Sequence, residues 1–186
     1  MPITPESDVE QRGWTVETAG SVQAQSGVTI PVTVDAQGPL KSAPGGLAQQ
    51  EGFELRVQAS FNPDRGHYLL RGISVKAPAG DEVTGTLLRG IAPLGVLRWV
   101  LPRTFELNHS ALTAAVVNFV APELRDVRDP DGIEKRQAVD LTDVATIYSL
   151  ASIVRYPPAK AVAEAFEFPS RTASNWIARA RAENLI

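Results

Sequence analysis

Two polar side chains at helical spacing near the end of the chain could bind nucleic acid. Arg171 and Asn175 lie four residues apart, so in an α-helix they occupy one side, a turn apart. An arginine can donate two hydrogen bonds to a guanine edge, and an asparagine can pair with an adenine edge in the major groove. Ala178 and Ala182 follow on the same side and are small enough to permit close approach. This pattern predicts a helix that contacts base edges.

Other polar and basic residues surround this pair. Ser170 begins the same segment, and Ser174 and Arg179 lie on the flanks of the predicted face, where they could contact bases or backbone. Lys160 and Arg181 are suited to contact phosphates. The predicted DNA-binding residues are therefore Lys160, Ser170, Arg171, Ser174, Asn175, Arg179 and Arg181.

Two short helices must position these side chains. Pro157 and Pro158 suit the first turn of one helix, whose expected apolar stripe is Ala159, Val162, Ala163 and Phe166. A break at residues 168–170 precedes a second helix, predicted from Ser170 to Glu183, with a buried stripe of Ala173, Trp176, Ile177 and Ala180. The small Ala163 would let the two helices cross closely. A helix-turn-helix has this pattern, and so does a plain α-hairpin in a core or a partner interface.

The segment resembles the bacterial helix-turn-helix, especially in uncharacterised proteins of high-GC Gram-positive bacteria and their phages. The resemblance rests on residues 160–164 (KAVAE), Thr172-Ala173, Trp176-Ile177 and Ala180-Arg181, and extends weakly to residues 83–91. It implies a DNA-binding domain at the end of the chain. The sequence departs from the family at Glu167, where a glycine is usual, and at Pro169, where a serine is expected. The corner between the two helices is therefore expected to form without easy access to a positive φ.

The rest of the chain predicts an α+β protein with a small N-terminal antiparallel sheet and packed helices. Residues 53–61 and 67–76 alternate around a turn that contains Pro63, Asp64 and Gly66, which predicts a β-hairpin. Residues 28–34 also alternate, and Pro31 places that strand at an edge. Residues 14–18 are a further candidate strand, and residues 35–52 are expected to form a long loop.

Helices are expected in the second half of the chain. Thr84 can cap one helix and Pro93 can begin another, whereas residues 111–120 are apolar enough for either a buried helix or a buried strand. Asp140 to Val154 is a clear helix, the first of a trihelical helix-turn-helix unit. The charged residues 123–136 mark a boundary. The predicted organisation is an α+β domain over residues 1–122, a linker over 123–137 and a helix-turn-helix domain over 138–186.

Composition restricts the class of protein. The 186 residues are 44% hydrophobic and 21% charged and include no cysteine, so neither a disulfide framework nor a thiolate metal site is possible. No apolar run suggests a signal peptide or a membrane anchor, which favours a cytoplasmic protein. His67 and His109 lack metal-ligand spacing, and residues 129–132 (DPDG) place unsuitable residues at the first and last calcium positions. We expect no catalytic activity, metal or cofactor.

The charge balance influences the expected mode of binding. The net charge is −3, and from Leu150 onward the chain has five basic and three acidic side chains. One copy should therefore bind DNA weakly, which favours a homo-oligomer, most simply a dimer. The sequence predicts a sequence-specific DNA-binding protein, bacterial or phage-borne, that regulates transcription. The alternatives are an assembly module whose C-terminal helices bind a protein, and DNA recognition for packaging or recombination.

Overall fold

The computed structural model describes residues 12–25, 27–44, 50–108, 113–122 and 139–186, and it has the predicted α+β architecture. Four long antiparallel strands follow one another across the sheet, and a short fifth strand pairs with the second. The strands are β1 (Thr15–Gln25), β2 (Val28–Pro39), β3 (Glu54–Asn62), β4 (His67–Lys76) and β5 (Glu106–Leu107).

The β3–β4 hairpin forms as its turn residues predict. The Asn62 side chain accepts a hydrogen bond from the Arg65 N–H at 2.8 Å, and Gly66 supplies a φ of +65°. The alternation of the first strand separates a buried side from an outer side, and the buried residues are Phe53, Leu55, Val57 and Ala59. An irregularity at Gln58/Ala59 shifts the register with β4 by one residue.

The edge position predicted for the strand with Pro31 is wrong, because β2 lies between β1 and β3. In an antiparallel strand the N–H and C=O of one residue point to the same side. The Pro31 carbonyl accepts a hydrogen bond from the Tyr68 hydroxyl at 2.5 Å. This bond lies on the side of β2 that pairs with β5 at Val28 and with β3 only from Thr33 onward. The missing N–H of Pro31 therefore removes no bond from the β1–β2 ladder.

The long loop predicted over residues 35–52 is also wrong in its first part. Strand β2 continues to Pro39, and the short 3₁₀ helix η1 (Leu40–Ser42) follows it. The alternation of buried Val34 and Ala36 with outward-facing Asp35 and Gln37 continues that of the predicted strand. Three glycines and two prolines over residues 38–46 obscured this pattern in the sequence.

The helices begin where capping residues indicate. They are α2 (Gly85–Gly90), α3 (Pro93–Val100), the 3₁₀ helix η2 (Leu101–Thr104), α4 (Ala114–Val120), α6 (Leu141–Ile153), α7 (Pro158–Ala165) and α8 (Ser170–Ala182). Thr84, Thr113 and Asp140 each accept a hydrogen bond from a backbone N–H in the first turn of α2, α4 and α6 respectively. The ambiguous apolar segment 111–120 is thus helical where the structure describes it.

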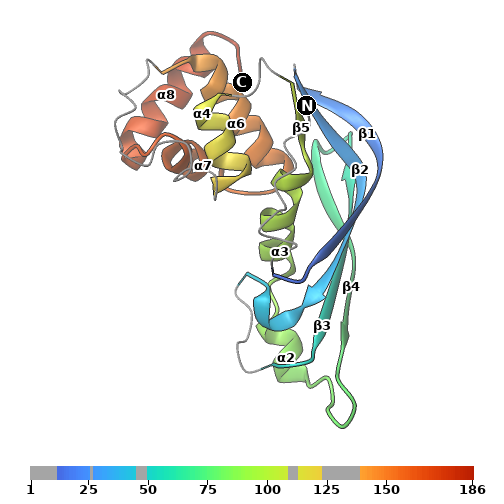
Figure 1. Ribbon diagram of the computed structural model, residues 1–186. Helices are drawn as coiled ribbons and strands as arrows, with labels where there is room; N and C mark the ends of the chain where they lie inside the picture. Colours follow the sequence, from blue (N-terminus) through green and yellow to red (C-terminus); the bar gives the residue numbers. More distant parts are fainter. Residues whose placement is uncertain (1–11, 26, 45–49, 109–112, 123–138) are drawn as a thin grey trace.

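The helices are divided between the face and one end of the sheet. In Figure 1, α3 runs along the concave face, α2 lies at one end, and α4, α6, α7 and α8 gather at the other. Helix α4 packs against α6 and α7. The predicted linker 123–137 falls within residues 123–138, outside the described part of the chain.

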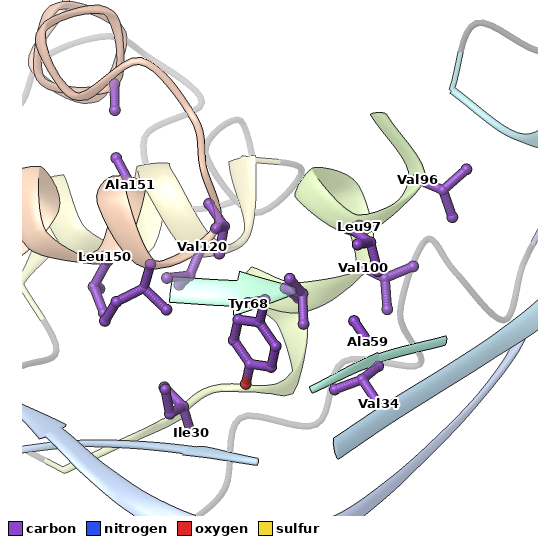
Figure 2. Packing of buried hydrophobic residues seen from close by; sticks show 14 of the residues in the cluster. Ile30, Val34, Ala59, Tyr68, Val96, Leu97, Val100, Val120, Leu150 and Ala151 are labelled. Carbon is purple, nitrogen blue, oxygen red and sulfur yellow. The ribbon is translucent and has the colours of Figure 1, made fainter. Parts of the chain in front are cut away.

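One apolar core joins the sheet to the helices. Figure 2 shows the Tyr68 ring among side chains of both parts, including Ile30 of β2 and Leu150 of α6. Tyr68 is 1% exposed, and burial raises the pKa of its hydroxyl. Its hydrogen bond to Pro31 satisfies a polar group that would otherwise be buried without a partner.

At the other end of the sheet, Trp14 covers a glycine. Its ring lies over Gly38, where an added Cβ would come within 2.4 Å of the indole Cγ. The indole N–H donates to Ser42 at 3.2 Å, and the ring packs edge-on against Trp99 with centroids 5.7 Å apart. The ring is therefore held from several sides and has little room to move.

We predict that Gly38→Ala lowers the free energy of unfolding by about 1–3 kcal/mol, because the new methyl group overlaps Trp14. Gly95→Ala is the matched control, since its Cβ would meet no atom closer than 3.6 Å and would favour helix α3. Urea unfolding of both variants measures the difference. Equal stability of the two variants would contradict the described packing.

Candidate nucleic-acid interface

The predicted helix pair is present, but the buried face of its first helix differs from the prediction. Helix α7 buries Ala161, Val162 and Ala165, whereas Ala159 is exposed and Ala163 is half-buried. Alanine occurs at alternate positions throughout this helix, so its sequence does not distinguish one small-residue face from another. Ala163 packs against the core but is only partly covered.

The corner after α7 has a left-handed backbone at a residue other than glycine. Glu167 has a φ of +54°, so the corner adopts a positive φ without the glycine for which this conformation is easy. The Phe168 N–H donates to the Ala163 carbonyl at 2.8 Å, and the Glu167 N–H donates to Glu164 at 3.3 Å. These two bonds form a Schellman motif. The Phe166 and Phe168 rings stack beside it with centroids 5.3 Å apart.

Helix α8 begins at Ser170, with Pro169 as its N-cap, and packs through a narrow stripe. Ala173, Ile177 and Ala180 are buried as predicted. Trp176 is only half-buried, which corrects the expectation that it belongs fully to the stripe. The Arg179 guanidinium lies 4.4 Å from the centroid of its ring, a cation–π distance. This ring therefore supports a basic side chain at the surface.

The opposite face of α8 is exposed as its spacing predicts. The side chains of Arg171, Asn175, Ala178 and Ala182 all lie at the surface. Across the described ranges, neither Arg171 nor Asn175 has a hydrogen bond or an ion pair through its side chain. A guanidinium and an amide one turn apart are thus both available to an external partner.

The other predicted DNA-binding residues are exposed but have partners within the chain. The Ser174 hydroxyl donates to the Ser170 carbonyl at 2.9 Å, within α8 itself. Arg181 donates to the Tyr148 hydroxyl of α6 at 2.8 Å. These contacts and the stacking of Arg179 on Trp176 direct two arginines along the flank of α8. Both can still donate further hydrogen bonds, because a guanidinium carries five N–H groups.

Lys160 of α7 belongs to a separate polar cluster. Its ammonium lies 3.6 Å from the Glu164 carboxylate and 5.5 Å from the centroid of the Tyr156 ring. Hydrogen bonding to Tyr156 is the main cause that raises the pKa of Lys160. The Tyr156 hydroxyl in turn donates to Glu164 at 2.7 Å, and burial raises its pKa. Glu164 offsets part of the positive potential here.

Two contacts that support this unit come from outside it and had no signal in the sequence. The Asn118 side chain of α4 donates to the Ala165 carbonyl at the end of α7. Arg98 of α3 donates to the Arg155 carbonyl at the end of α6. The paired residues are 47 and 57 positions apart in the sequence, so no local pattern connects them.

Other kinds of site receive no support from the part of the chain that is described. Within it, no group of three histidine or acidic side chains could hold a metal ion. No helix there is long and apolar enough to cross a bilayer. Comparison with protein-family models, with curated proteins and with solved structures finds no match to this chain. Support for a nucleic-acid interface therefore comes from the geometry of α7 and α8.

We predict that Glu167→Gly raises the free energy of unfolding by about 0.5–1 kcal/mol, because glycine adopts the left-handed conformation without a Cβ penalty. Thermal unfolding measures the gain. Glu167→Ala is the control, since it removes the same carboxylate and keeps the Cβ, so it should give no gain. A similar increase in both variants would assign the effect to the carboxylate instead of the backbone.

Proposed function

We propose that this protein binds double-stranded DNA and that α8 lies in the major groove. The observation that carries the proposal is the pair Arg171 and Asn175, which is exposed, unpartnered within the described chain and one turn apart. Because the stripe on the other side of the same helix is buried, the side with Arg171 and Asn175 faces outward. A helix packed on one side and presenting arginine and asparagine on the other suits hydrogen bonding to guanine and adenine edges.

The dimensions of α8 agree with this role. Its 13 residues extend about 20 Å at 1.5 Å per residue, enough to cross a groove and contact a few base pairs. Arg179 and Arg181 are held at its flank by Trp176 and Tyr148 and would contact backbone phosphates. Ser170 and Ser174 at its beginning, and Lys160 of α7, complete the proposed contact surface.

The proposed biological use is transcriptional regulation in the bacterial cytoplasm, by a dimer of a bacterial or phage-borne protein. The helical unit carries only a small excess of basic side chains, so two copies would be needed to gather enough phosphate contacts for tight binding. DNA recognition for packaging or recombination would use the same groove contacts. No catalytic step is part of the proposal.

A protein-binding role is the second candidate, and exposed apolar residues favour it. Leu185 and Ile186, just after α8, are 41% and 37% exposed. Together with the low basicity, they would suit a partner protein better than a phosphate backbone. The missing turn glycine does not favour this alternative, because Glu167 adopts the left-handed conformation that the corner requires.

Selection of bound oligonucleotides from a random pool, with the full-length protein, separates the two candidates. Enrichment of one motif is the expected result. Failure to enrich any motif at low salt, where phosphate contacts are strongest, would reject the DNA proposal. A protein–protein role would then be the better account of α8.

We predict that Arg171→Ala and Asn175→Ala each weaken binding to the selected sequence by about 1–3 kcal/mol, because each removes hydrogen bonds to a base edge. Mobility-shift titration measures the loss. Arg89→Ala is the matched control, since Arg89 is an exposed helical arginine on α2, at the far end of the molecule from α8 (Figure 1). Unchanged affinity in the α8 variants would remove these residues from the interface.

We predict that Lys160→Ala weakens binding to all DNA sequences and reduces the slope of log affinity against log salt by about 1, because one phosphate contact is lost. Fluorescence anisotropy over a series of salt concentrations gives the slope. Lys41→Ala is the control, since Lys41 also pairs with a glutamate, Glu51 at 3.2 Å, but lies on η1. If both variants keep the original slope, Lys160 contacts no phosphate.

A further inference from the structure

The corner between α6 and α7 repeats the conformation found after α7. Arg155 has a φ of +58° and closes α6 with the same pair of bonds, since Tyr156 N–H donates to Ala151 at 2.8 Å and Arg155 N–H to Ser152 at 3.0 Å. Both corners that lead to α8 therefore hold a non-glycine residue in the left-handed region. Such residues persist when the surrounding structure holds them in place.

A side chain of α3 holds the first corner. Arg98 donates from Nε and Nη2 to the Arg155 carbonyl, at 2.9 and 2.5 Å, and its guanidinium lies 5.9 Å from the Tyr156 ring centroid. A cation is favoured at this position, because the last carbonyls of a helix form the negative end of its dipole. Helix α3 itself packs on β3 and β4. The first corner is thus connected to the sheet.

A side chain of α4 holds the second corner. The Asn118 amide donates to the Ala165 carbonyl at 3.2 Å, two residues before Glu167. Ala165 is the last residue of α7, so its carbonyl has no partner further along the helix. Val116, Val117 and Val120 of α4 are buried, which leaves the amide of Asn118 little freedom to move away.

We propose that Arg98 and Asn118 are positioning residues that set the orientation of α8 by holding the two corners that precede it. The unit that presents α8 then includes α3 and α4, and the sheet acts as its frame. The part of this inference that concerns base contacts rests on the proposed function. Loss of either contact lets a corner relax, so α8 would keep its charges but no longer align Arg171 and Asn175 with base edges.

Amide hydrogen exchange tests the corners without DNA. The variants are Arg98→Met and Asn118→Ala in the full chain, with Arg89→Met on α2 as the control. We expect exchange at least tenfold faster at the Tyr156 amide in Arg98→Met and at the Phe168 amide in Asn118→Ala. These amides close the two Schellman motifs. The amides of β2 and β3 should be unchanged, and the control should change neither corner.

A purely structural role gives a different result. If the two contacts only add to global stability, exchange will accelerate in the sheet and the corners alike, and the inference is overturned. Unchanged exchange at both corners overturns it as well. A third variant, Asn118→Gln, keeps the amide and should restore part of the protection at Phe168.

DNA binding supplies a second measurement. At a temperature where all variants are folded, each positioning variant should lose about tenfold in affinity for the selected sequence and keep its affinity for random DNA. Equal loss for both kinds of DNA would contradict a positioning role. If the unsubstituted protein binds no DNA at all, the proposed function fails, and hydrogen exchange alone decides whether the two residues hold the corners.

Discussion

The left-handed corner at Glu167 is the constraint on which the arrangement of α8 depends. The chain must reverse direction within a few residues after α7, and a positive φ at that point closes the helix and sends the backbone away from its axis. The direction of α8 then determines which of its faces can be buried. Because Ala173, Ile177 and Ala180 face inward, Arg171 and Asn175 must face outward. The left-handed conformation of Glu167 thus belongs to the same arrangement that exposes Arg171 and Asn175.

The sheet supports the first of the two corners that precede α8, the one at Arg155, through helix α3. Tyr68 connects the two parts, since its ring lies in the common core and its hydroxyl donates to Pro31 within β2. Helix α3 runs along the concave face (Figure 1). Its Arg98 side chain donates to the Arg155 carbonyl at the end of α6. A small helical unit buries limited apolar area by itself, so packing against the sheet and α4 adds to its stability. The N-terminal part therefore contributes to the core on which the helices of the proposed interface pack.

The interface was partly predictable, and the errors have physical causes. The polar face of α8 follows from helical periodicity, because a mixture of large apolar and charged residues leaves one orientation favoured. Helix α7 offers alanine at alternate positions, and alanine is compatible with either the buried or the exposed side, so its stripe was misplaced. The positive φ of Glu167 was missed because residue type reports intrinsic preference, and here the bonds from Phe168 and Glu167 overrule it. Trp176 was assigned to the buried stripe by its helical spacing, although its ring also supports Arg179 at the surface.

The sequence by itself determined the α+β class, the β3–β4 hairpin and the beginnings of α2, α3 and α6. These features depend on alternation, turn residues and caps within a few positions of one another, where the chain has little choice of partner. Tertiary structure alone decided that Pro31 lies inside the sheet, that α4 joins the helical unit, and that Arg98 and Asn118 reach the corners before α8. Those contacts join residues tens of positions apart, and only the folded backbone selects one such pair among the many that the side chains would allow.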